Sequence, residues 1–291
     1  MINGKPYSDY GFIPINFYGF LDMPSRLGET FYDWGEYIEP LVHEDDLFWK
    51  SREFKIDVFF DNRLTLKTFN QSVNELSSIV GFFPITNEFG TFNVKLKEVN
   101  KLKHFNDLNV VYRLVFVEEE PMFIGAIPAA VGGLYLTIDG YSLFSDFKVL
   151  TEIVKLNDNI ATLKQSRITT STPQKQLTDF RTFKNIEIKC HMLKSDDYIN
   201  NINRLKKLLS QSDFRQVVYK SVDYKCFITD GFSVKIEKEK IQFTIYLNIF
   251  SQVGLFTDSL FGSTLFFNGN QKKIKESLFE YNLFKTGIFQ R

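Results

Sequence analysis

The sequence has few of the residues that build disulfide scaffolds, metal sites or sugar-binding platforms. Its 291 residues include only 2 Cys, 3 His and 2 Trp. Cys190 and Cys226 form no CxxC pair, so a disulfide-rich scaffold is excluded. His191 follows Cys190 directly, but neighbouring side chains on a strand point to opposite faces, so the two should not share a metal. We expect an inward Cys190, an outward His191, and no metal or cofactor.

Net charge and long apolar runs are also missing. Lys plus Arg and Asp plus Glu both number 35, and a net charge of zero argues against a general nucleic-acid binder. The longest uncharged stretch, residues 121–138, is marginal for a bilayer, and its Pro128 would interrupt a helix. It reads as a buried linker leading into a strand, with a membrane-touching loop tip as the minor alternative. No apolar signal sequence follows Met1, so we expect a soluble protein made inside the cell.

Motifs of catalysis are missing as well. Gly125, Gly132 and Gly133 lack the ending of a phosphate-binding loop, and neither GxSxG nor HExxH occurs. The acidic runs 44–46 and 118–120 could in principle bind a cation, but such runs are usually solvated turns. The basic residues of 204–207 most simply form the wet face of a helix. Nothing points to a pair of catalytic carboxylates, and we expect no enzyme.

Phenylalanine is what the chain has in excess. It contains 32 Phe and 13 Tyr, more than two modest cores need. Aromatic side chains are enriched where subunits meet. The composition therefore indicates a component of an assembly.

One pattern of elements occurs twice along the chain. Residues 54–60 alternate as a strand with one buried face, 66–80 follow helical spacing, and 92–97 and 110–117 are strand-like. The second copy has a strand at 186–192, a helix at 198–209, and strands at 217–219, 224–228, 232–236 and 241–250. The offset is about 132 residues throughout, and a fixed period is a sign of repeated architecture. Two unrelated α+β domains are the alternative.

The segments outside the repeats are harder to place. Residues 134–168 contain β-prone runs at 135–138, 147–154 and 160–163, whereas 166–178 are polar and predict a long exposed hairpin arm or a mobile loop. The aromatic-rich residues 254–291 predict an arm on a neighbouring subunit, with packing on its own domain as the alternative. The predicted division is an extended N-terminal segment at 1–51, a first domain at 52–121, a hairpin-rich linker at 122–183, a second domain at 184–253 and a C-terminal arm at 254–291.

The N-terminal segment carries the most distinctive residues, in the order MPSRLGETFYDWG…IEPLV…DDLFW…REFKIDVFF. It resembles the N-terminal segment of distal tail proteins from long-tailed phages and prophages, particularly of Bacteroidetes-type lineages. The positions that carry this resemblance are Met23, Pro24, Arg26, Tyr32, Asp33, Trp34, Gly35, Glu39 and Pro40. They cover about 45 residues at the level of motifs, with the following strand–helix–strands pattern similar to the family's tube-like belt domain.

The resemblance implies a structural role in a virion. In that family the belt domain forms a ring, usually of six copies, that continues the tail tube and joins it to the adsorption apparatus. Typical members carry a galectin-like β-sandwich as their second domain, whereas this chain repeats the first pattern. Tandem tube-like domains resemble the hub proteins of tails, in which three chains imitate a six-fold ring.

We therefore predict an α+β fold with two tandem tube-like domains, mainly antiparallel, each with one helix. The predicted function is a ring-forming component of a phage tail tip, present in the virion and assembled in the host cytoplasm. Its predicted partners are other copies of itself and the neighbouring tail proteins, with DNA passing through the lumen unbound. A trimeric hub and, from another class, a carbohydrate-binding or hydrolytic baseplate module are the alternatives, as is a cellular assembly protein unrelated to phage.

Overall fold

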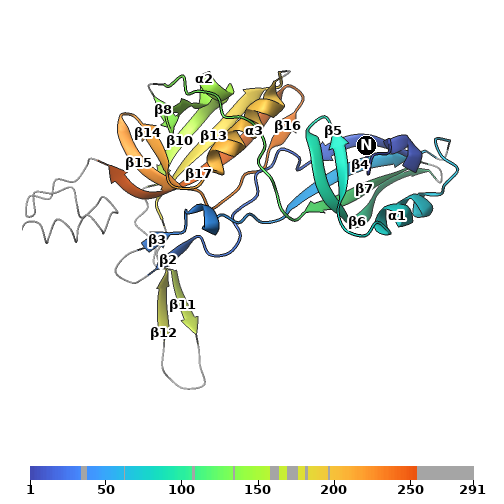
Figure 1. Ribbon diagram of the computed structural model, residues 1–291, viewed down its shortest axis with the longest axis horizontal. Coiled ribbons are helices and arrows are strands. Elements are labelled where there is room, and N and C mark those ends of the chain that lie inside the picture. The colour runs from blue at the N-terminus through green and yellow to red at the C-terminus, as the bar shows by residue number, and fades with distance from the viewer. Residues whose placement is uncertain are drawn as a thin grey trace, which may run out of the picture.

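The computed structural model describes residues 1–33, 38–61, 63–106, 109–133, 135–157, 164–168, 176–180, 183–195 and 197–253. The described chain forms two units, each built on its own antiparallel sheet, which lie side by side along the long axis of the molecule (Figure 1). The fold class is α+β, as predicted.

The first unit is a five-stranded sheet with one helix. Its strands lie in the order β1 (Phe12–Tyr18), β4 (Arg52–Phe60), β7 (Asn109–Glu118), β6 (Gly90–Asn106) and β5 (Phe83–Asn87). Helix α1 (Phe69–Ser77) follows β4, and two short 3-10 helices, Tyr7–Tyr10 and Glu44–Asp46, lie outside the sheet. Every neighbouring pair of strands is antiparallel.

The alternation of apolar residues explains this sheet. Phe54, Ile56 and Val58 point to one face of β4 and are fully buried, because side chains two residues apart share a face. Helix α1 begins with a capping box, in which the Thr68 and Gln71 side chains each accept from the other's backbone N–H. The helix is shorter at both ends than the predicted 66–80.

The second unit has a larger sheet of eight strands. Their order is β10 (Leu150–Asn157), β13 (Asn185–Leu193), β17 (Lys240–Val253), β15 (Val222–Phe227), β14 (Arg215–Tyr219), β8 (Leu136–Ile138) and β9 (Tyr141–Ser142), with β16 (Lys235–Glu237) also paired to β17. Helix α2 (Leu143–Phe147) precedes β10, and helix α3 (Tyr198–Leu209) follows β13 with the predicted bounds.

The predicted repeat is confirmed at the level of topology. In both units an edge strand pairs with a second strand, a helix follows, and three further strands return so that the last one pairs with the second; the second unit adds the short β16 before its last strand. The equivalent elements are β1 and β10, β4 and β13, α1 and α3, β5 and β14, β6 and β15, and β7 and β17. Each edge strand also carries a register shift near its start, between Pro14 and Asn16 and between Thr151 and Ile153.

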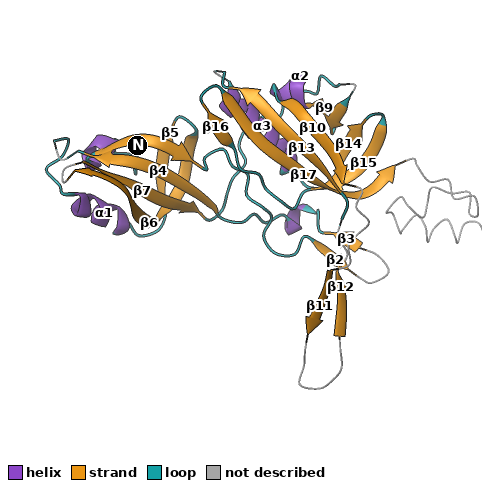
Figure 2. Ribbon diagram, turned by 180° about the vertical axis from the view of Figure 1, so that it is seen from behind, coloured by secondary structure: helices purple, strands orange, loops and turns teal. Residues whose placement is uncertain are grey.

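The repeat extends into the connections between the first and second strands. The first connection, residues 19–51, carries a hairpin of β2 (Phe31–Asp33) and β3 (Ile38–Pro40). The second connection, residues 158–184, carries a hairpin of β11 (Lys164–Ile168) and β12 (Gln176–Phe180). Figure 1 and Figure 2 show β11 and β12 projecting away from both sheets. The predicted arm at 166–178 is therefore a hairpin where its strands are described, whereas residues 169–175 lie outside the described part.

The sheets depart from the predicted boundaries in two places. Strand β1 belongs to the first unit, although residues 1–51 are predicted as a separate extended segment. Its alternation is broken by Pro14 and the register shift, which hides it from a search for period two. The predicted linker 122–183 supplies β8, β9, α2 and β10 to the second unit, and the strand predicted at 147–154 begins only at Leu150.

The apolar stretch 121–138 is also corrected. It leads into β8 as predicted, but Met122, Ile124 and Val131 are exposed, so it is not a buried linker. Within the part of the chain that the structure describes, no helix is long and apolar enough to cross a membrane.

One edge of each sheet is covered and the other is open. On the β5 edge, Pro84 O accepts from Asn3 N–H (2.8 Å) and Thr86 N–H donates to Met1 O (2.9 Å), and the β14 edge pairs with β8. No described strand pairs with the outer edge of β1 or of β10. Large apolar side chains are exposed on both open strands. They are Ile13, Ile15, Tyr18, Leu150 and Ile153.

Candidate functional site

The first connection joins the two units, and the predicted motif lies within it. Met23 and Phe232 exchange backbone hydrogen bonds of 2.9 Å in both directions, which pairs the connection with the segment between β15 and β17. The Ser25 hydroxyl accepts from Gly231 N–H at 3.1 Å. A Cβ at position 231 would overlap the carbonyl oxygens of Met23 and Pro24, so only glycine permits this approach.

Arg26 is buried and makes hydrogen bonds both within the first connection and to the second unit. Its N–H donates to Thr229 O at 2.9 Å, and its guanidinium Nη2 donates to Asp46 O at 2.9 Å. Burial lowers the pKa of Arg26, while the nearby Asp46 opposes that shift. The chain then returns beside Arg26, which forms a bridge with Trp49.

The remaining motif residues lie on the first hairpin. Tyr32 on β2 pairs with Glu39 on β3, and Phe31 pairs with Pro40. Asp33 ends β2, whereas Trp34 and Gly35 lie outside the described residues. The ring of Phe31 lies 5.0 Å from that of Phe183, which in turn lies 4.8 Å from Phe227 on β15. The structure thus brings Met23, Pro24, Arg26, Tyr32, Asp33, Glu39 and Pro40 onto one segment that lies across the second unit.

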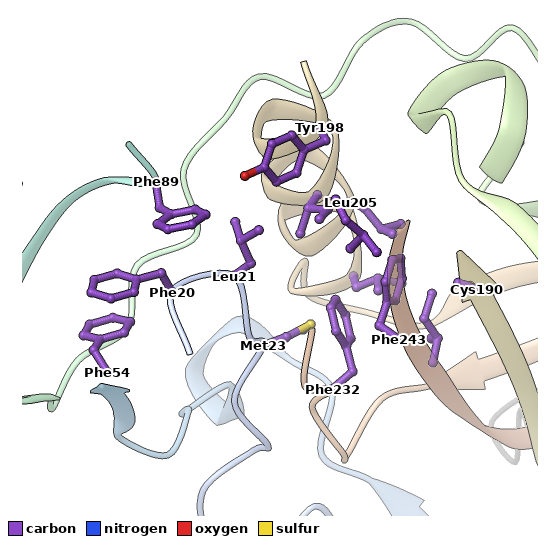
Figure 3. Close-up of a cluster of buried hydrophobic side chains, with 14 of the residues drawn as sticks. Phe20, Leu21, Met23, Phe54, Phe89, Cys190, Tyr198, Leu205, Phe232 and Phe243 are labelled. Carbon is purple, nitrogen blue, oxygen red and sulfur yellow. The ribbon is translucent and has the colours of Figure 1, made fainter. Parts of the chain in front are cut away.

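A cluster of buried apolar side chains, called the seam below, extends from one unit into the other (Figure 3). Phe20 stacks between Phe54 (4.5 Å) and Phe89 (5.6 Å) of the first unit. Leu21 follows it and lies between these rings and helix α3, which presents Tyr198 (Figure 3). Burying the aromatic surface of this seam is worth several kcal/mol, at roughly 25 cal/mol per Å². The units are therefore joined by a hydrophobic core as well as by backbone pairing.

Beside the seam lies a buried cluster of charges drawn from both units. Arg52 at the start of β4 donates from Nε (2.9 Å) and Nη2 (2.5 Å) to Glu118 Oε2 at the end of β7. Arg52 Nη1 also donates to Asp22 O at 3.1 Å in the first connection. Lys206 of α3 faces the same groups and is only 3% exposed. The two units thus share one set of four ionisable side chains.

Burial dominates the titration of this cluster. It raises the pKa of Glu118 although Arg52 opposes the shift, and it raises the pKa of Asp22 against the hydrogen bond from Val234 N–H. Burial, helped by the positive Arg52, lowers the pKa of Lys206 to about 7. A charge placed here is costly unless its partners stay in place, so the cluster favours one arrangement of the two units.

These charges correct two predictions. Glu118 is 6% exposed and ion-paired, whereas the run 118–120 is predicted as a solvated turn; Glu119 and Glu120 are exposed as predicted. Lys206 is buried, whereas 204–207 are predicted to form the wet face of a helix. The physical reason is that α3 is covered on both sides, by its own sheet and by the first unit.

The sequence did contain a signal for this cluster. Arg52 is in phase with the inward Phe54 and Ile56, and Glu118 is in phase with Leu114 and Phe116. Lys206 follows Ile202 by four residues on the buried stripe of α3. Strict periodicity would have placed all three inside, against the general preference of charges for solvent.

Two clefts flank the first connection. The larger, about 690 Å³, lies between β1 and the turn at Phe89 on one side and α3 and β16 on the other. Its charged residues are Asp22, Glu88, Lys194 and Lys235. The smaller, about 380 Å³, opens beside Arg52 and Ser233. Among the residues that are described, no three His, Cys, Asp or Glu side chains gather as metal ligands would.

The structure also shows the surroundings of Cys190, His191 and Trp49. Cys190 is buried and His191 is partly exposed, as the alternation predicts, and burial raises the pKa of the Cys190 thiol to about 12. Trp49 packs against Phe123, with ring centroids 4.9 Å apart. Trp49 is thus engaged in packing within its own chain.

Comparisons with known proteins give little further information. No model of a known protein family matches the sequence, and no curated protein matches it. Among solved structures, the chain is similar to the Dit protein of phage SPP1, described as a paradigm of the hub adsorption apparatus in phages that infect Gram-positive bacteria. The alignment covers 84% of this chain and 97% of that one, with 13% identity and a TM-score of 0.30. A score this low does not establish a shared fold.

Proposed function

We propose that the chain is a structural component of a phage tail tip, in which copies close a ring that continues the tail tube and joins it to the adsorption apparatus. The observation that carries the proposal is the duplicated sheet-and-helix unit with one open edge per copy. The resemblance of Met23 to Pro40 to distal tail proteins supports the same role, because those residues occupy the joint between the units.

The open edges give this role a physical basis. An exposed strand with apolar side chains invites pairing with another chain, and native proteins cover such edges. Closing a ring of subunits covers all of them at once. The exposed Ile13, Ile15 and Leu150 would then be buried in large apolar interfaces, which also accounts for the excess of phenylalanine.

The number of chains has two candidate values. Distal tail proteins usually form rings of six chains, each giving one belt domain. The five-strand arrangement that the two units share favours the second candidate, a hub of three chains in which six units imitate six-fold symmetry. The chain would be non-catalytic in either ring.

The proposed partners are those of a tail tip. They are further copies of the chain, the tube and tape-measure proteins, and a hub or receptor-binding protein, with DNA passing through the lumen without specific binding. The protein would reside in the virion after assembly in the host cytoplasm. The origin from Bacteroidetes-type phage or prophage stays a prediction.

Native mass spectrometry combined with class averages from negative-stain electron microscopy tests this proposal. We expect particles with a central channel, of three chains for the hub that the shared topology favours and of six chains for the alternative ring. A monomer that persists up to the highest soluble concentration, with no ring in the averages, would contradict the proposed role.

A further inference from the structure

The first connection joins the two units within one chain, and the contacts that it makes have equivalent positions elsewhere in the molecule. The first connection leaves the first unit after β1 and binds the second unit of the same chain. It covers the loop between α3 and β14, where Asp213 N–H donates to Val42 O at 2.7 Å. Its hairpin, β2 and β3, lies against Phe183 through Phe31.

The second connection has the same position in its unit. Its Phe183 packs against Phe31 and Phe227, but none of its described residues forms a hydrogen bond or ring contact with the loop 78–82 of the first unit. It leaves the second unit after β10 and carries its own hairpin, β11 and β12. No third strand among those described pairs with this hairpin, which projects away from the body of the molecule (Figures 1 and 2). An isolated two-stranded hairpin is marginally stable at best in water, so it requires a surface on which to pack.

The surface equivalent to the covered loop is free on the first unit. The loop between α1 and β5, residues 78–82, corresponds to the loop between α3 and β14. Val80 in it is 98% exposed and Phe82 is 40% exposed. Leu66, just before α1, is fully exposed as well. Val80 and Phe82 thus expose apolar surface on the loop whose equivalent in the second unit is covered by a connection.

The positions of the helices agree with this correspondence. Helix α3 lies on the side of the second unit that faces the first unit, and α1 lies on the side of the first unit that faces away from the second (Figures 1 and 2). The surface that receives a connection therefore points in the same direction along the molecule in both units. A contact between chains that repeats the contact within the chain is then head-to-tail, the kind that builds rings.

We propose that the second connection of one copy, with its β11–β12 hairpin, docks on the first unit of a second copy over the loop of Val80 and Phe82. In the same way the first connection, through Val42, covers the equivalent loop of the second unit of its own chain. This inference rests on the proposed function and deepens it, since it assigns the surface through which copies meet. First and second units then alternate around the assembly.

Cross-linking of paired cysteines tests the geometry. The double variant Val80→Cys/Ser166→Cys places one thiol on the receiving loop and one on the central pair of the hairpin. The native Cys190 and Cys226 are buried, so a short bismaleimide has little else to react with. We expect a ladder of covalent multimers from the double variant and only monomers from each single variant, because a head-to-tail contact brings together two different sites.

A matched control and a second measurement keep the outcomes distinct. Met122 is 74% exposed and lies outside the proposed contact, so Met122→Cys/Ser166→Cys should give no ladder. Val80→Asp should leave the unfolding midpoint unchanged and weaken self-association at least about tenfold. A wild-type ring that survives Val80→Asp and gives no ladder overturns this interface but leaves the proposed function standing. A wild-type protein that never assembles overturns both.

Discussion

The buried pair of Arg52 and Glu118 shows how single residues fix the arrangement of the molecule. Both side chains are almost fully buried, and the first connection adds the Asp22 carbonyl as a third partner. Arg52 also lies over the rings of Phe54 (4.9 Å) and Phe92 (5.3 Å). Such a pair contributes little net stability compared with apolar residues, but losing one member is costly.

We predict that Arg52→Met lowers the free energy of unfolding by about 3–5 kcal/mol, because Glu118 is left buried without its partner. The double variant Arg52→Met/Glu118→Leu should recover most of that loss. Urea denaturation followed by fluorescence measures both values. Equal destabilisation by the single and double variants would show that the packing of Arg52, and not the ion pair, carries the effect.

Because Lys206 is buried, we predict that the free energy of unfolding depends on pH. Its pKa is lowered to about 7 in the folded chain and returns to its ordinary value near 10.5 on unfolding. Between these values the unfolded chain binds more protons, so this residue makes stability rise with pH, by at most about 1.4 kcal/mol per pH unit. Below pH 7 both states are protonated and the full cost of burying the charge is present.

Lys206→Met should remove this rise, so that the difference between wild type and variant changes steadily from pH 7 to pH 10. Urea denaturation at several pH values measures it. The matched control is Lys207→Met, because Lys207 is only partly buried. If Lys207→Met and Lys206→Met alter the pH profile alike, burial of Lys206 is not its cause.

The residues of this cluster also mark what the sequence could and could not predict. The strands and helices that surround them follow from apolar periodicity, and α3 was predicted at both ends. Whether Glu118 and Lys206 face solvent depends on what packs against them. Periodicity places both on buried faces, whereas the general preference of charges for solvent argues against that placement. The contact between the units decides between the two, and the sequence does not show that contact.

At the scale of elements, the first connection is the feature that unites the molecule. Its described residues hold no regular structure longer than three residues, yet its backbone pairs with the second unit at Met23 and Arg26. The segment lies across another surface, and that surface belongs to its own chain. The motif stands out in the sequence because a segment that packs on another surface uses specific side chains at irregular spacing.

We predict that Gly231→Ala detaches this segment from the second unit. The added methyl group would overlap the carbonyl oxygens of Met23 and Pro24, so the backbone pairing with Phe232 must break. Hydrogen–deuterium exchange should then become faster at the Met23 amide. Asp230→Ala, one residue away and exposed, should leave that exchange unchanged. Unchanged protection in Gly231→Ala would contradict the account of the joint.

Helix α1 allows a smaller test within the first unit. Thr68→Ala removes one half of the capping box and should cost about 1 kcal/mol of stability. Thermal denaturation measures the loss. Thr68→Ser, which keeps the hydroxyl, should lie close to wild type. A Thr68→Ala variant as stable as the wild type would show that packing alone holds this helix.

At the scale of the whole molecule, the duplication is the central result. The repeat was visible in the sequence as three elements at one offset, although its side chains match poorly. The edge strands β1 and β10 and the paired hairpins were not recognised as parts of it. Edge strands carry register shifts and exposed apolar residues, so the period-two signal is weak there. The equivalence of the hairpins is a property of topology alone.

The mass and symmetry of the purified assembly test the central claim most directly, that the two units are equivalent parts of one ring. Native mass spectrometry and electron-microscopy averages of the same sample give both values. The account predicts three chains with six similar densities around a channel, formed by alternating first and second units. A chain that remains monomeric at every concentration, or an assembly in which the two units occupy unrelated positions, would contradict it.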